Sequence, residues 1–117
     1  MDPMLPILEQ AVRIFERPRR IVVVVEGDVE ELEAVHRLDM AVELGRITGK
    51  QVVVDLSGVG FFSGAVLHVL LAQLRRGGGL PWLAGPLSTV ALRRLEVTGT
   101  APHFRIFPTL FEAMCLE

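Results

Sequence analysis

The side chains that could do catalytic or metal chemistry are few in this sequence, and they are scattered. His36 and Asp39 stand three residues apart, which on a helix places both on one face and could supply two metal ligands. No third ligand follows at a recognisable spacing, and His68 and His103 lie far along the chain. We therefore interpret His36 and Asp39 as a surface pair and expect no metal site.

The serines do not form a nucleophilic site. Ser57 and Ser63 lack the G-x-S-x-G frame of a nucleophile elbow, and no His or Asp is placed in the sequence to activate them. The chain has no Tyr and a single cysteine, Cys115, so neither a disulfide framework nor a thiolate metal cluster is available. The sequence therefore predicts that the protein is not an enzyme and uses no cofactor.

Two glycine-containing segments resemble phosphate-binding loops only superficially. Gly49–Lys50 is similar to the end of a Walker A loop, but Gln51 stands where a Ser or Thr should hold magnesium, and a strand follows instead of a helix. Gly77–Gly79 comes after a predicted helix, whose C-terminal partial charge repels phosphate. We interpret this glycine run as a helix stop.

One segment has the chemistry of a binding site. Residues 55–67 lead from the carboxyl end of a predicted buried strand to the start of a predicted helix, the edge at which open α/β sheets bind ligands and partners. Ser63 is the predicted N-cap of that helix, and a phosphate on its hydroxyl would change the local charge by about two units. Phe61 is interpreted as core, whereas Phe62 is left open between core and surface.

Alternating strand and helix signals surround this segment. β-branched runs predict strands at 21–25 and 51–56, and the helical pattern between them predicts a crossover helix and hence a parallel strand pair. Shorter strands are expected at 81–84 and 104–107. Residues 11–15 are either an edge strand or part of a short helix over 5–12. The expected caps, stops and helix-surface pairs are Asp28 with Glu31, Glu33 with Arg37, Gly49, Ser63, Gly77–Gly79, Ser88, Gly99, and Thr109 with Glu112.

Composition places the chain in a broad class. Half of its 117 residues are hydrophobic and 22% are charged, which suits one folded domain over residues 1–117. The net charge of −2 favours neither nucleic acid nor direct membrane insertion. The first residues lack a signal-peptide pattern, and the longest apolar run, 61–74, is too short to span a bilayer. We expect a cytoplasmic α/β protein with a mixed, mostly parallel sheet of four to five strands and about four helices.

Several segments, in order and at matching spacing, resemble the STAS domain of bacterial anti-sigma factor antagonists. The resemblance covers residues 21–117. It rests on the segments Val25–Asp28, Val52–Val59 with its V-x-x-D-L pattern, Phe61–Leu71, Leu83–Pro86, Val90–Gly99 and Phe107–Met114. It implies a STAS-like fold and a non-catalytic role in signalling and transcription regulation, in which the domain binds an anti-sigma factor, a kinase-like ATP-binding protein.

The chain departs from this family at the phosphorylated position. The family motif D-S-S/T-G-L falls on residues 63–67, so that Ser63 replaces the aspartate, Ala65 the phosphoacceptor and Val66 the glycine. Because Ala65 has no hydroxyl, the resemblance implies binding that phosphorylation at this position does not switch off. Ser63, two residues earlier, is the candidate phosphorylation site.

The resemblance assigns the partner-binding residues to Gly58, Phe62, Ser63, Gly64, Ala65 and Val66, with Phe62 as the candidate anchor. Arg93 and Arg94 are expected on the solvated side of their helix, where an acidic partner could use them. The alternative function is a STAS subunit of a larger assembly, either a lipid-transport ABC complex or a stress-sensing scaffold. A nucleotide or lipid held at the strand ends is a third and weaker class, and a homodimer is left open.

Overall fold

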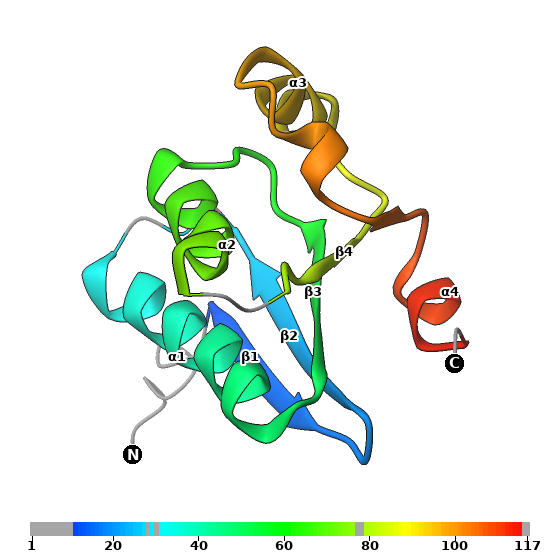
Figure 1. The fold of residues 1–117 in the computed structure, drawn as a ribbon. Helices are drawn as coiled ribbons and strands as arrows, with labels where there is room; N and C mark the ends of the chain where they lie inside the picture. Colours follow the sequence, from blue (N-terminus) through cyan, green and yellow to red (C-terminus); the bar gives the residue numbers. More distant parts are fainter. Residues whose placement is uncertain (1–10, 28, 30, 77–78, 116–117) are drawn as a thin grey trace, which may run out of the picture.

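The computed structural model describes residues 11–27, 29, 31–76 and 79–115 of the chain. Within this part, five strands form one sheet in chain order (Figure 1). They are β1 (Val12–Glu16), β2 (Arg20–Glu26), β3 (Gln51–Gly58), β4 (Trp82–Ala84) and β5 (Ile106–Phe107). The β1–β2 pair is antiparallel and the other three pairs are parallel. The predicted mixed, mostly parallel sheet is confirmed.

The helices flank this sheet on both faces. The α-helices described are α1 (Leu32–Thr48), α2 (Gly64–Arg76), α3 (Thr89–Val97) and α4 (Leu110–Cys115). Figure 1 shows α1 and α2 together on one face, α4 on the other, and α3 beyond one end of the sheet. The predicted set of about four helices is confirmed for this part of the chain.

Strands β2 and β3 are hydrophobic almost throughout because both of their faces are covered. Ile21, Val23, Val54 and Leu56 point into the main core, where their side chains have no exposed surface. Val53 points the other way and packs in a smaller cluster with Ala84 and Ala113 of α4. The β-branched runs that predicted the strands thus also supply both cores.

Most predicted helix caps are present. Gly49 and Gly99 adopt the positive φ values of 75° and 72° that end α1 and close the turn after α3. Ser88 and Thr109 accept hydrogen bonds from the third residue after each of them, at 3.0 and 3.2 Å. The start of α1 differs, because Glu31 occupies the N-cap and makes no side-chain cap bond there. Asp28, Gly77 and Gly78 lie outside the described residues.

Arg37 of α1 binds the edge strand β1 instead of its predicted partner on the same helix. Residues 12–16 pair with β2, which confirms the edge-strand interpretation, while residues 5–10 of the alternative helix lie outside the described residues. The expected Glu33–Arg37 ion pair is wrong, because the Arg37 Nε donates to the Val12 carbonyl oxygen at 2.7 Å. A carbonyl at a sheet edge needs a donor from outside the ladder, and the Arg37 side chain supplies it.

The last strand is shorter than expected. Residues 104–107 were predicted as a strand, but only Ile106–Phe107 pair with β4. Ala101–His103 form a 3-10 turn, which the Phe104 N–H closes by donating to the Ala101 carbonyl at 3.1 Å. In the described residues, no helix is both long and apolar enough to cross a membrane.

Candidate functional site

The end of β3 is shaped by its own aspartate. Asp55 is 9% exposed, and its Oδ1 accepts a hydrogen bond from the Ser57 N–H at 3.0 Å. The Val59 N–H donates to the Leu56 carbonyl, also at 3.0 Å, and turns the chain out of the strand. Asp55 therefore has a structural role here, since its carboxylate orders the strand end from which the segment to α2 departs.

Gly58 lies where β2 and β3 approach closely. Its carbonyl accepts a hydrogen bond from the Gly27 N–H at 2.9 Å. A Cβ at this position would lie 3.2 Å from the Glu26 Cγ and 3.4 Å from the Val25 carbonyl oxygen. The absence of a side chain lets β3 reach this register, and Gly58 stays exposed at the carboxyl end of this central strand.

Ser63 is confirmed as a cap, and its hydroxyl has a second role. Its Oγ accepts from the Val66 N–H at 3.2 Å and donates to the Val29 carbonyl oxygen at 2.9 Å. The residue is 6% exposed. The hydroxyl that was the candidate phosphorylation site is thus buried and bonded on both sides, and its phosphorylation remains a prediction.

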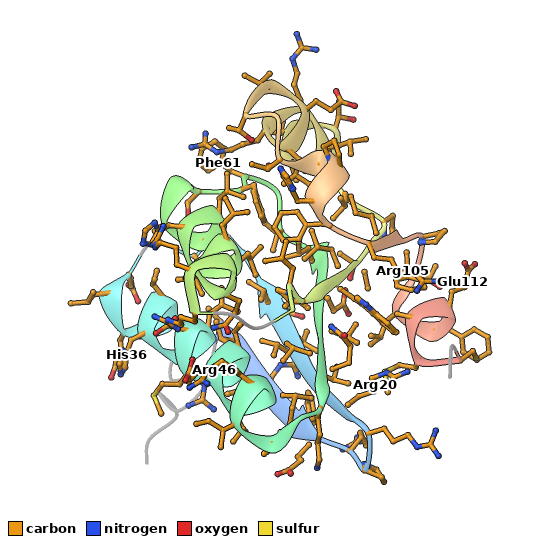
Figure 2. All side chains as sticks on the ribbon, in the orientation of Figure 1. Arg20, His36, Arg46, Phe61, Arg105 and Glu112 are labelled. Atoms are coloured by element: carbon orange, nitrogen blue, oxygen red, sulfur yellow. The ribbon has the colours of Figure 1, made fainter. Side chains whose placement is uncertain are left out.

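The two adjacent phenylalanines have opposite environments. The Phe62 side chain has no exposed surface and belongs to the main core, so the position left open is a core residue. Phe61 was interpreted as core, and this is wrong, because it is 39% exposed. Phe62 packs in the main core, whereas the Phe61 ring lies against Arg94 of α3, so the difference depends on where α3 packs. Phe61 lies between the ends of α2 and α3 (Figure 2).

Arg94 of α3 covers part of the exposed ring. Its guanidinium carbon lies 5.5 Å from the centroid of the Phe61 ring, within the range of a cation–π contact. A Cβ at Gly64 would lie 3.2 Å from an Arg94 terminal nitrogen. The Arg94 Nε is buried and has no hydrogen-bond acceptor among the described residues. Arg93 is exposed as expected, whereas Arg94 is partly buried against the loop.

A serine joins α3 to the same loop. The Ser88 Oγ donates to the Gly60 carbonyl oxygen at 2.7 Å while it caps α3 by accepting from the Ala91 N–H. Residues 60–63 are therefore attached to α3 on one side and, through Ser63, to the backbone before α1 on the other. Such attachment at both ends presents Phe61 on a preorganised loop.

Of the six predicted partner-binding residues, three are exposed and three are buried. Gly58, Gly64 and Ala65 are exposed, whereas Phe62, Ser63 and Val66 are buried and support the loop from beneath. In this conformation Phe62 cannot be the anchor that contacts a partner. Contact between the exposed residues and a partner remains a prediction.

Helix α3 extends the exposed region. Val90 and Val97 are 53% and 73% exposed and, at helical spacing, share one face of α3 with Arg94. We name the loop–α3 surface by its residues: Phe61, Gly64, Ala65, Val90, Arg94 and Val97. Sequence reasoning named Arg94 as a residue that an acidic partner could use but missed Val90 and Val97, although a signal existed. Ala91 and Leu95 already fill the core face of that helix, which leaves Val90 and Val97 outside it.

The histidines lie elsewhere. His36, Asp39 and His68 line a groove between α1 and α2. His103 lies elsewhere, in the 3-10 turn before β5. In the part of the chain that the structure describes, no three His, Cys, Asp or Glu side chains gather as a metal site requires.

Comparison with known proteins identifies the fold. No protein-family model and no curated protein matches the sequence. An anti-sigma factor antagonist from Mycobacterium paratuberculosis superposes with a TM-score of 0.67 and 26% identity, over 88% of this chain and 89% of that one. An anti-sigma-factor antagonist (STAS) domain protein from Planctomyces limnophilus superposes with a TM-score of 0.70 and 19% identity, over 88% and 94%. The chain therefore has the STAS fold and resembles anti-sigma factor antagonists.

Proposed function

We propose that this chain is a non-catalytic bacterial regulator of transcription that binds an anti-sigma factor through the loop–α3 surface. The observation that carries the proposal is the exposed Phe61 ring. It contacts Arg94 and lies beside the first turn of α2, which begins with the small residues Gly64 and Ala65. The proposal is also supported by the structural similarity to the Mycobacterium paratuberculosis anti-sigma factor antagonist, which is 26% identical in sequence.

The composition of this surface suits a protein partner. Aromatic and Arg side chains are the residue types that most often carry binding energy at interfaces. Gly64 and Ala65 have little or no side chain, so a partner can approach the first turn of α2 closely. Arg93 and Arg94 add positive charge, which complements an acidic side chain on the partner.

The proposal includes the absence of a phosphorylation switch at Ala65. An exposed Ala at this position accepts no phosphate, so the anti-sigma factor would remain bound irrespective of any kinase activity directed there. Control would then come from the abundance of this protein or from another site.

The test begins with a pull-down from a lysate of the source cell, followed by identification of an ATP-binding anti-sigma factor by mass spectrometry and titration of the purified pair. Phe61→Ala and Ala65→Glu should each weaken binding more than about tenfold, because they remove the anchor or place a charge in the contact. Phe111→Ala is the matched control, since Phe111 is 76% exposed on α4 and away from this surface. Retention of no anti-sigma factor, or equal loss in the control, would refute the proposal.

The second candidate is a STAS subunit of a larger assembly, and one observation favours it. Leu32, Met40 and Ile47 of α1 are 83%, 56% and 67% exposed, and their spacing places them on one side of that helix. An exposed apolar row of this kind suits a permanent contact with other subunits. Recovery of transporter or scaffold subunits by wild type, and their loss with Met40→Asp, would favour this function over the first.

A further inference from the structure

Helix α1 carries an exposed stripe along the side that faces away from the sheet. Leu32, Met40 and Ile47 are exposed apolar residues, His36 is exposed between them, and Glu43 is partly exposed. These five residues follow one another at intervals of three or four, which places their side chains on one side of the helix. Figure 2 shows His36 on the side of α1 away from the strands. We name these five residues the α1 stripe.

The order of residues in the α1 stripe is self-complementary. Met40 lies at its centre, Leu32 and Ile47 at its two ends, and His36 and Glu43 between. A second copy of α1, laid antiparallel on the first about a two-fold axis near Met40, brings Leu32 opposite Ile47 and His36 opposite Glu43. The two Met40 side chains then meet at the axis. Apolar residues thus meet apolar residues, and an imidazole, which can donate a hydrogen bond, meets a carboxylate.

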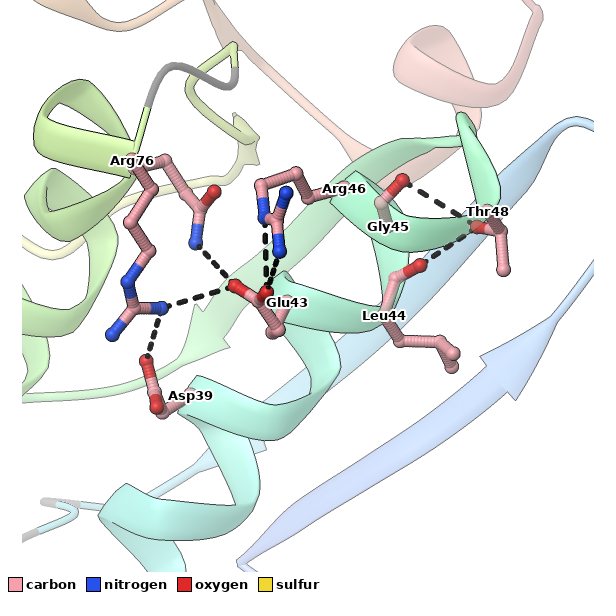
Figure 3. Close-up of polar contacts among 8 residues, drawn as sticks. Asp39, Glu43, Leu44, Gly45, Arg46, Thr48 and Arg76 are labelled. Atoms are coloured by element: carbon pink, nitrogen blue, oxygen red, sulfur yellow. Dashed lines mark hydrogen bonds and ion pairs between the residues drawn. The ribbon is translucent and has the colours of Figure 1, made fainter.

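The charged groups beside the stripe are already paired within the chain. Glu43 accepts from the Arg46 Nε at 2.9 Å and from the Arg76 Nη1 at 3.2 Å, and Asp39 accepts from the same Arg76 nitrogen at 3.3 Å (Figure 3). The hydrogen bond from Arg46, above all, lowers the pKa of Glu43 to about 2, so its carboxylate is ionised at neutral pH. Paired charges cost less to cover than isolated ones, so this network permits a second copy to lie over the stripe.

A groove beside the stripe adds to the contact. It has a volume of about 390 Å³ and lies between α1 and α2. Leu32 and His36 of the stripe line it from α1, and the apolar Val69 and Ala72 line it from α2. A second copy on the stripe would therefore also meet a recess with apolar walls, which adds apolar contact to that of the single helix.

We propose that the chain pairs with a second copy of itself through the α1 stripe, with α1 antiparallel to α1 across a two-fold axis near Met40. A second copy is the favoured occupant because the stripe complements itself position by position, in both apolarity and polar character. The stripe shares no residue with the loop–α3 surface. The dimer would therefore present two docking surfaces, one on each copy, whichever protein binds there.

The expected dimer is weak. Helix α1 has 17 residues, so the paired helices run side by side for about 25 Å. This contact is smaller than a standard protein interface, and we expect a dissociation constant on the order of 100 µM. Sedimentation equilibrium of the purified full chain between about 10 µM and 1 mM should show the average mass rise from one chain towards two.

Two opposite substitutions at the axis test the pairing itself. Met40→Asp and Met40→Lys should each weaken self-association more than about tenfold, because each brings like charges together at the axis. A mixture of the two variants should associate again, since the two-fold axis then pairs an Asp with a Lys. Phe111→Asp is the matched control, because it places the same charge on an exposed apolar position of α4 and should change the dissociation constant less than about twofold.

The register has a test of its own. His36→Glu should weaken the dimer more than about tenfold by facing Glu43 of the second copy, whereas His36→Gln, whose amide still donates, should change it less than about threefold. Thermal melting verifies that each variant is folded. A monomer at every concentration would overturn the proposal and leave this face of α1 to a subunit of another kind. Self-association that survives Met40→Asp, or a mixture of the two Met40 variants that stays monomeric, would also overturn it. None of these results depends on an anti-sigma factor, because the chain is measured alone.

Discussion

At the scale of single residues, Ser63 connects two parts of the backbone with one hydroxyl. It caps α2 through the Val66 N–H and binds the Val29 carbonyl, 34 residues earlier in the chain. Because both bonds are buried, removal of the hydroxyl would leave one donor and one acceptor without a partner. The residue therefore contributes to stability through a local and a long-range interaction together.

We expect Ser63→Ala to lower the free energy of unfolding by about 1–3 kcal/mol, from the lost cap and the unpaired Val29 carbonyl. Urea denaturation followed by Trp82 fluorescence measures the change. Ser88→Ala is the comparison, since Ser88 makes an equivalent cap in a more exposed position and should cost less. A loss for Ser63→Ala smaller than that for Ser88→Ala would contradict this account.

A second prediction at this scale concerns Glu43 and the pH dependence of the free energy of unfolding. Its pKa is lowered from 4.5 to about 2, chiefly by the hydrogen bond from Arg46. The folded state therefore holds the ionised form more strongly than the unfolded chain does. This contribution is present above about pH 4.5 and is lost as the pH falls towards 2. Glu43→Gln should flatten the decline of unfolding free energy between these pH values, as urea titrations at successive pH would measure. An identical decline in both proteins would exclude the Glu43 contribution.

At the scale of elements, helix α1 approaches strand β3 at Gly45. A Cβ there would lie 2.1 Å from the Val52 Cγ2 and 3.0 Å from the Lys50 carbonyl oxygen. The first atom belongs to a side chain of β3, and the second is a backbone atom of the residue just before that strand. The glycine in the last turn of α1 is therefore required by packing, although Gly is a poor helix former.

Gly45→Ala should destabilise the protein by about 1–3 kcal/mol, because steric overlap with β3 exceeds the gain in helix propensity. Gly64→Ala is the control, since a Cβ there meets only the movable end of Arg94 at 3.2 Å. Guanidinium denaturation of the two variants compares them directly. An increase in stability with Gly45→Ala would show that α1 and β3 are farther apart than described.

At the scale of the whole molecule, the fold separates the loop–α3 surface from a basic cavity, which is lined in part by Arg19, Arg20 and Lys50. The loop–α3 surface follows the carboxyl end of β3, and the basic cavity opens at the amino ends of β2 and β3. The main core lies between them, and Phe62 is among its largest buried side chains. Two neighbouring residues thus have different places in the fold: Phe62 lies in the core, and Phe61 lies in the surface that we propose for docking.

Phe62→Ala should cost about 3–5 kcal/mol through the cavity that it leaves in the core. Phe61→Ala should cost less than about 1 kcal/mol, because its ring is partly exposed and its contact with Arg94 lies at the surface. Thermal and urea unfolding of both variants test the pair. Similar losses for the two would mean that Phe61 also belongs to the core, and the proposed anchor would then be wrong.

Features that depend on neighbours in the chain were predictable from the sequence. The β-branched runs at 21–25 and 51–56 determined the two central strands, because such residues suit a strand buried on both faces. Ser63, Ser88 and Gly49 determined helix ends, since a cap needs only the next turn of backbone. The matching order of segments also determined the STAS-like fold.

Features that join distant parts of the chain were decided by the tertiary structure alone. Arg37 reaches Val12 instead of Glu33, and Gln73 meets Glu43 across two helices. The different burial of Phe61 and Phe62 likewise depends on where α3 packs. A sequence pattern records periodicity within one element, but a side chain's partner and exposure depend on the elements that surround it.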